Sequence, residues 1–119
     1  MRLYDFTRPQ RYTEFEHRLP HARESLAKNP NDGSALAAFG EWWAFRHRPD
    51  WAAELFEKSR AAGAEISPLA MARCYWQLDK LPEARVEFRR AMEKKEAPEF
   101  YLRLCIDAVE RQITAPKTE

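Results

Sequence analysis

The chain has 119 residues, which is enough for one domain with a modest hydrophobic core. Its 20 Lys and Arg residues nearly balance 19 Asp and Glu residues, so the overall charge favours neither nucleic acid nor an anionic membrane as a partner. No apolar run is long enough to span a membrane, and the first residues, MRLYDFTRPQR, lack the apolar stretch of a signal peptide, so we expect a cytoplasmic protein.

The N-terminal part of the chain has the pattern of an amphipathic helix. Thr7 and Gln10 have the spacing of a capping box, and apolar residues then recur at three- and four-residue steps. Pro20 interrupts this stripe, so the segment forms either one kinked helix, which we prefer, or two short helices. The stripe consists of Tyr12, Phe15, Leu19, Ala22 and Leu26.

Two helices are predicted in the middle of the chain. The sequence NPNDGS at 29–34 is a break, and the helix expected over 34–47 has to end before Pro49. Asp50 is expected to cap the following helix, and Gly63 stands where a C-terminal stop is needed. These two helices are joined by a short turn, which makes them antiparallel neighbours.

Proline marks the start of each later helix. Ser67 followed by Pro68 places a capping side chain before a residue already held at helical φ. The dipeptides Leu-Pro and Ala-Pro further along have the same effect, with connections short enough to keep neighbours antiparallel. The expected helices cover 68–79, 82–95 and 98–112, and a disordered tail is expected over 113–119.

The sequence matches itself when it is shifted by 32 residues. Gly40 and Ala72 are small residues at which a second helix can approach closely, and Phe56 and Phe88 are expected to fill the contact from the partner helix. The pattern therefore predicts a repeated helical hairpin. The matched residues are Leu36, Phe39, Gly40, Trp43, Ala52, Phe56 and Ser59 in the first unit and Pro68, Met71, Ala72, Tyr75, Ala84, Phe88 and Ala91 in the second.

The motifs L-x2-F-G-x2-W with A-x3-F, then M-A-x2-Y with A-x3-F-x2-A, resemble the signature of the tetratricopeptide repeat (TPR). The period here is 32 residues, against the usual 34. The resemblance implies an all-α fold, a TPR-like right-handed superhelix of antiparallel helical hairpins with capping helices at both ends. The expected units of this single domain are an N-terminal cap or degenerate repeat over 8–32, repeats over 33–64 and 65–97, and a C-terminal capping helix or half repeat over 98–112.

Three tryptophans and two phenylalanines crowd the stretch FGEWWAFRHRPDW. At about 100° per residue, Trp43 lies in the packing stripe of its helix, so we assign it to the core. Trp42 and Trp51 are expected to pack between repeats. Phe45 lies on the opposite side, the face that lines the concave groove in a TPR-like array. We therefore expect Phe45 to be an exposed groove residue.

The groove face combines aromatic and charged residues. Exposed Phe45 and Trp76 beside Glu41 and Arg73 would give a peptide both an apolar anchor and polar orientation. In the alternative interpretation, the two aromatics close a self-packed cavity or touch the caps. The predicted activity is binding of a protein or peptide. The predicted partner-binding residues are Glu41, Phe45, Leu69, Arg73, Trp76, Gln77 and Tyr101.

Catalytic and metal-binding signatures are weak. His17 and His21 are four residues apart, but Pro20 lies between them and no third ligand is near in sequence, so we interpret them as a solvated pair. The sequence has no nucleophile elbow or phosphate loop, and we expect neither an enzyme nor a cofactor. Cys74 and Cys105 are isolated and are expected to be reduced and buried.

Two alternatives to binding of another protein remain. A basic cluster on the fifth expected helix favours nucleic acid as a second hypothesis, although interleaved glutamates lower its potential. Self-assembly into a homo-oligomer is a third, because a solenoid of two units exposes apolar ends unless its caps are complete. The cluster consists of Arg85, Arg89, Arg90, Lys94 and Lys95.

Overall fold

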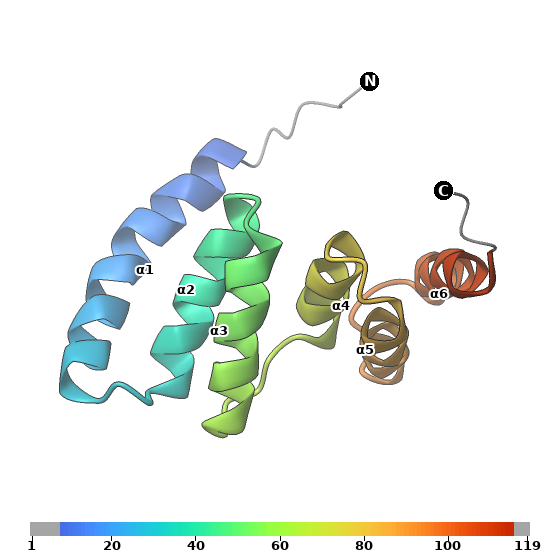
Figure 1. The fold of residues 1–119 in the computed structure, drawn as a ribbon. Coiled ribbons are helices and arrows are strands. Elements are labelled where there is room, and N and C mark those ends of the chain that lie inside the picture. Colours follow the sequence, from blue (N-terminus) through green and yellow to red (C-terminus); the bar gives the residue numbers. More distant parts are fainter. Residues whose placement is uncertain (1–7, 116–119) are drawn as a thin grey trace.

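The computed structural model describes residues 8–115, and this part of the chain forms six helices and no strands. The all-α prediction is confirmed. Consecutive helices pack side by side, so α1 and α6 lie at opposite ends of the row (Figure 1). The helices are α1 (Arg8–Lys28), α2 (Gly33–Phe45), α3 (Pro49–Ala61), α4 (Pro68–Gln77), α5 (Leu81–Glu93) and α6 (Glu99–Thr114).

Helix α1 runs without a break through Pro20, so the preferred prediction of one helix rather than two is confirmed. It packs mainly on α2 and buries only Phe15 and Ala22. Thr7, the predicted capping residue, lies outside the described residues. Helix α1 is therefore attached to the rest of the fold along one narrow stripe.

The predicted caps are partly confirmed. Ser67 Oγ accepts a 3.2 Å hydrogen bond from the amide of Ala70 at the start of α4, as expected. The prediction for Asp50 is wrong, because Pro49 already begins α3 and the preceding Arg48 occupies the cap position. Asp50 instead accepts two hydrogen bonds, of 2.9 and 3.1 Å, from the Arg48 guanidinium, which holds the pKa of its carboxyl near 2.

Most helix ends lie within two residues of the predicted ones. The predicted tail over 113–119 starts too early, because α6 continues to Thr114. Ile113 packs against the main core, which explains the two extra helical residues. Residues 116–119 lie outside the described part of the chain.

The turns between helices recur at the 32-residue spacing. His47 and Asp79 both adopt positive φ, of 61° and 59°, in the α2–α3 and α4–α5 turns. Gly63 and Lys95, also 32 residues apart, adopt positive φ after α3 and α5. In all four turns the amide after the left-handed residue donates to a carbonyl five residues earlier, at 2.8 to 3.1 Å. The backbone therefore ends equivalent helices in the same way.

The helices of each hairpin meet at the predicted small residues. A Cβ atom added to Gly40 would lie 2.7 Å from ring carbons of Phe56, so the phenylalanine occupies the space that a side chain would need. Ala72 and Phe88 are fully buried in the core that α3 to α6 share. A separate small cluster of alanines joins α1 to α2. The cluster consists of Ala22, Ala35 and Ala38.

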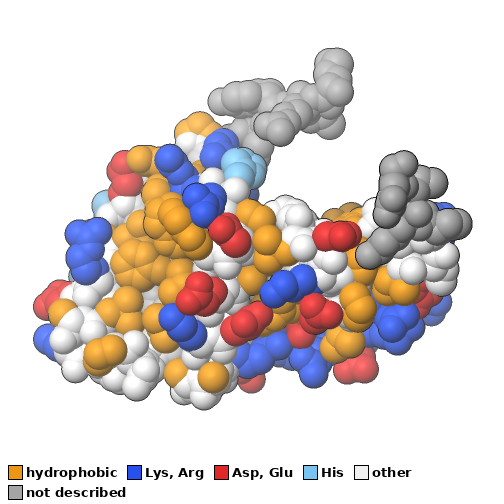
Figure 2. Space-filling view, viewed as in Figure 1, with side chains coloured by type: hydrophobic (Ala, Val, Ile, Leu, Met, Phe, Trp, Pro, Cys, Tyr) orange, Lys and Arg blue, Asp and Glu red, His pale blue; other side chains and the backbone are white. Residues whose placement is uncertain are grey.

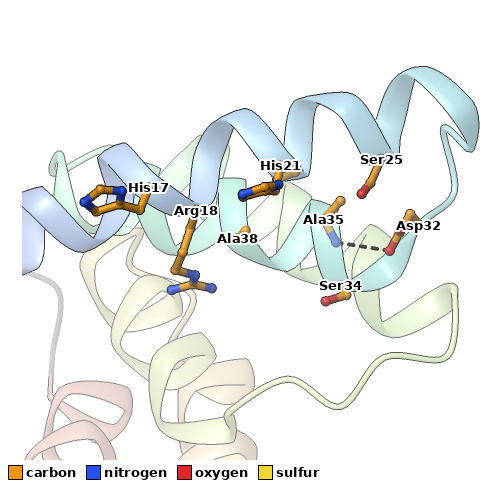
Figure 3. A pocket seen from close by; sticks show the side chains of 9 residues that line it. His17, Arg18, His21, Ser25, Asp32, Ser34, Ala35 and Ala38 are labelled. Carbon is orange, nitrogen blue, oxygen red and sulfur yellow. Dashed lines mark hydrogen bonds between the residues drawn. The ribbon is translucent and has the colours of Figure 1, made fainter.

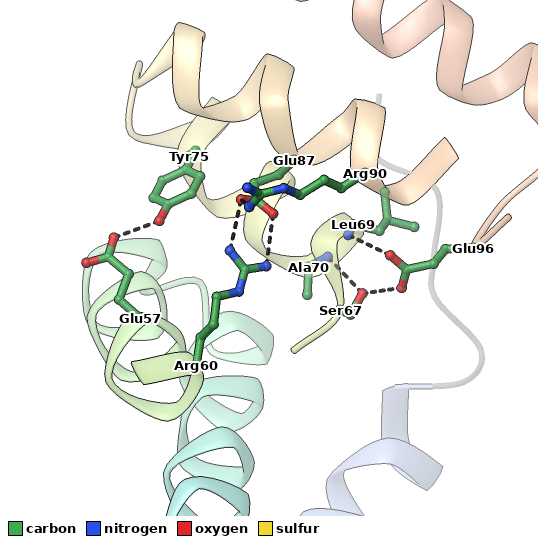
Figure 4. A network of polar contacts seen from close by, with 9 residues as sticks. All are labelled: Glu57, Arg60, Ser67, Leu69, Ala70, Tyr75, Glu87, Arg90 and Glu96. Carbon is green, nitrogen blue, oxygen red and sulfur yellow. Dashed lines mark hydrogen bonds and ion pairs between the residues drawn. The ribbon is translucent and has the colours of Figure 1, made fainter. Parts of the chain in front are cut away.

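A buried carboxylate joins the two hairpins (Figure 4). Glu87 on α5 is 4% exposed and accepts two hydrogen bonds from Arg60 on α3, at 2.9 and 3.0 Å, and one from Arg90 at 2.8 Å. Tyr75 on α4 donates to Glu57 on α3 at 2.7 Å. Burial and this hydrogen bond raise the pKa of the Tyr75 phenol. These contacts fix α3 against α4 and α5.

Candidate partner-binding groove

A hollow of about 370 Å³ lies between α1, α2 and α4. Apolar side chains from α1, α2, α3 and α4 form part of its lining, and charged side chains come from all three flanking helices. Such a combination of apolar surface and a few polar groups suits the binding of a peptide or ligand. The lining residues are Arg11, Glu14, Phe15, Arg18, Glu41, Ala44, Phe45, Phe56, Ala70, Arg73, Cys74 and Gln77.

Four of the seven predicted partner-binding residues line this hollow. Glu41 and Phe45 come from α2, and Arg73 and Gln77 come from α4. The 32-residue shift matches Glu41 to Arg73 and Phe45 to Gln77, so equivalent positions of the two hairpins do face one space. The structure thus brings together the two charged residues and the glutamine of the predicted set with one of its aromatic residues.

The expectation that Phe45 is exposed is wrong. Its side chain is only 4% exposed, because α1 covers it. The Phe15 ring lies 5.2 Å from the Phe45 ring between centroids, and the Arg8 guanidinium carbon lies 4.2 Å from the Phe45 centroid. Phe45 therefore forms part of the wall of the hollow rather than a protruding anchor.

The other three predicted residues lie away from the hollow. Leu69 packs partly against the core, and its amide donates to Glu96 at 3.1 Å. Trp76 donates from its indole nitrogen to Gln112 on α6 at 2.7 Å. Tyr101 accepts a 3.2 Å hydrogen bond from Arg73. The structure thus connects Trp76 and Tyr101 to contacts between α4 and α6.

Trp43 and Trp51 are more exposed than predicted. Trp43, assigned to the core, is only half-buried and packs edge-on against Trp51 at 4.7 Å between ring centroids. Trp51 is 42% exposed, and the Arg48 guanidinium carbon lies 3.5 Å from its centroid. Trp42 packs against Phe15 of α1. Phe45 is thus more buried than Trp43, the reverse of the predicted order, because α1 covers the face that the sequence assigns to the open groove.

The contribution of α1 to the hollow is not apparent from the sequence, which indicates only a cap. Arg18 on α1 donates to Glu41 on α2 at 2.6 Å, and this exposed ion pair forms part of the rim of the hollow. Arg11, Glu14 and Phe15 add to the same wall. The apolar stripe of α1 is visible in the sequence, but the element that it faces is not.

The lining of the hollow includes a thiol, that of Cys74 on α4. Burial raises the pKa of this thiol to about 11, so the thiol stays protonated at neutral pH. Cys74 and Cys105 are buried free thiols, as predicted.

A second hollow of about 450 Å³ adjoins Arg18 and contains His17 and His21 (Figure 3). Asp32 also lines it, but its carboxylate accepts a hydrogen bond from the Ala35 amide at 3.2 Å and caps α2. Across the described residues, no three His, Cys, Asp or Glu side chains are placed to hold a metal ion.

Comparison with known proteins identifies no relative. A scan of protein-family models finds no match, and comparisons with curated proteins and with solved structures return no significant match. None of the helices among residues 8–115 has the length and apolar character needed to cross a membrane.

Proposed function

We propose that this chain is a non-catalytic binding module, similar to a TPR array, that takes a peptide or protein segment in the hollow between α1, α2 and α4. A cytoplasmic location remains part of this prediction. The hollow itself is the observation that carries the proposal, because three helices contribute charged rim residues and apolar wall residues to one space of peptide-binding character.

The recurring turns support the repeat on which the proposal depends. The left-handed residues and their hydrogen bonds return at 32-residue spacing, and each hairpin puts a small residue at the matched helix crossing. Two hairpins placed in this way bring corresponding faces of α2 and α4 toward the same side. Helix α1 then completes the third wall.

The distribution of charge favours a protein over a nucleic acid. Acidic and basic side chains alternate over the visible face without one dominant sign (Figure 2). In the basic cluster on α5, Arg89 pairs with Glu110 at 2.7 Å and Arg90 pairs with Glu87 at 2.8 Å. These pairs lower the positive potential that a phosphate backbone would need.

A displayed library of random peptides tests the proposal, because such a library samples many candidate ligands at once. The purified full chain is expected to enrich related peptides, and Arg73→Ala/Gln77→Ala should weaken their binding by about tenfold or more. Both side chains are exposed on α4, so the double variant is expected to keep its fold. Glu54→Ala/Lys58→Ala, an exposed pair on α3, is the matched control.

The result distinguishes the hollow from other surfaces. Peptides that bind the Arg73/Gln77 variant as tightly as the wild type would place binding elsewhere, and loss of binding in the Glu54/Lys58 control would place it on α3. Phe45→Ala is not a clean test, because this buried side chain also supports the fold.

A further inference from the structure

The outer face of α6 holds two large apolar side chains in water. Phe100 is 71% exposed and Leu104 is 61% exposed. The opposite face of the same helix is packed into the core through Leu102, Cys105 and Val109. At 100° per residue, Phe100 and Leu104 lie on the side that points away from these three residues. Helix α6 therefore carries large apolar residues on both faces, and only one face is covered within the described part of the chain.

The position of α6 in the row explains where a further element would pack. The 32-residue shift matches Phe100 and Leu104 to Pro68 and Ala72 of α4. Helix α4 buries both of these residues and pairs with α5. Phe100 and Leu104 occupy the matched positions of α6, but no helix follows α6 within residues 8–115 to pack on them. Leu104 is larger than Ala72, so a helix that packs on Leu104 would lie farther from α6 than α5 lies from α4.

The charges on this helix match a second copy of the same helix. Glu99, Arg103, Asp107 and Arg111 follow one another at four-residue steps and alternate in sign. If two such helices run antiparallel, Glu99 of each faces Arg111 of the other, and Arg103 faces Asp107. A parallel pair would place like charges together. All four residues are exposed. Within one copy Arg103 donates to Glu99 at 2.8 and 3.1 Å, so in the dimer Arg103 would lie between this carboxylate and Asp107 of the other copy.

We propose that the chain forms a twofold-symmetric homodimer through antiparallel packing of the outer faces of α6, with Leu104 at its centre and Phe100 toward each end. Each copy uses the same patch, so the contact closes at two subunits and does not propagate into a filament. One helix from each subunit buries an area at the low end for specific interfaces, so the dimer dissociates at micromolar concentrations. The contact leaves the hollow between α1, α2 and α4 free.

Sedimentation equilibrium of the full chain over micromolar concentrations tests the dimer. The wild type should change from monomer to dimer as its concentration rises. Leu104→Glu should remain monomeric, because it places a carboxylate at the centre of the apolar contact. Val86→Glu, a change at an exposed apolar residue of α5, is the control and should leave the dissociation constant unchanged.

A pair of charge reversals tests the antiparallel register. Arg103→Glu alone places a carboxylate opposite Asp107 in each of the two cross-subunit pairs, and Asp107→Arg alone places a guanidinium opposite Arg103 in each pair, so each variant should dimerise at least about tenfold more weakly. An equimolar mixture of the two variants should form heterodimers of wild-type affinity, because both cross-subunit pairs then have opposite charges. Circular dichroism checks that both variants keep their helix content.

Three outcomes would overturn the proposal. A wild type that stays monomeric at every concentration excludes the dimer. A dimer that Leu104→Glu leaves intact uses another surface. A mixture of the charge variants that stays monomeric excludes the antiparallel register. None of these results bears on peptide binding in the hollow.

Discussion

The two hairpins, α2–α3 and α4–α5, have the same contact between their helices, but the small residue at that contact differs. In α2–α3 the ring of Phe56 occupies the volume of a missing side chain at Gly40. In α4–α5 the matched position is Ala72, and Phe88 is buried just as completely as Phe56. A repeated sequence pattern therefore fixes which residues meet, while each pair of residues sets how closely its helices approach.

The largest effect is expected where the two hairpins are alike. Phe56→Ala and Phe88→Ala should each lower the free energy of unfolding by about 3 to 5 kcal/mol, because each leaves a cavity in the core. Urea denaturation measures the change, and Val86→Ala, an exposed substitution on α5, should alter it by less than about 0.5 kcal/mol. A loss below about 1 kcal/mol at either phenylalanine would contradict the shared packing.

A smaller effect is expected where the hairpins differ. Gly40→Ala should destabilise the protein by about 1 to 3 kcal/mol despite the better helix propensity of alanine, since the new Cβ would lie 2.7 Å from the buried Phe56 ring. Gly40→Leu should be worse. Thermal unfolding of Gly40→Ala in a Phe56→Ala background provides the control, because without the ring the added methyl group should no longer destabilise. An equal penalty in both backgrounds would rule out this contact as the cause.

The smallest effect on stability is expected in the turns that follow the two hairpins. Gly63 and Lys95 occupy matched positions with positive φ, of 96° and 56°. Lys95→Gly should stabilise the protein by about 0.5 to 1 kcal/mol, and Gly63→Ala should destabilise it by about 1 kcal/mol, because only glycine adopts this conformation freely. Chemical denaturation of both variants checks the signs. Changes of the same sign would mean that the two turns are not equivalent.

The sequence predicts the helices well because their starts and ends depend on local residues. Ser67 and Pro68 determine the start of α4 as expected, whereas the cap predicted at Asp50 is wrong because Pro49 begins α3 one residue earlier. The groove is predicted only in part. Helical periodicity separates the faces of α2, but it does not show that α1 packs over Phe45 and leaves Trp43 half-buried.

The polar contacts of the groove depend on distances between helices. Arg18 and Glu41 are 23 residues apart, and nothing in their local sequence identifies them as partners. Trp76 similarly meets Gln112 only because α6 packs beside the hairpin before it. Contacts of this kind depend on the angle between elements, which the spacing of apolar residues leaves undetermined.

The packing of each helix on its neighbours in the chain also determines which part of the protein unfolds first. All extensive contacts join helices that are consecutive in the chain, so most native contacts close short loops, a property associated with fast folding. Unfolding can then begin at an end without disrupting the centre. Helix α1, held mainly by α2, is expected to exchange its amide hydrogens with solvent before α4 and α5 do. Each such opening uncovers Phe45, so a buried aromatic becomes transiently accessible to a ligand.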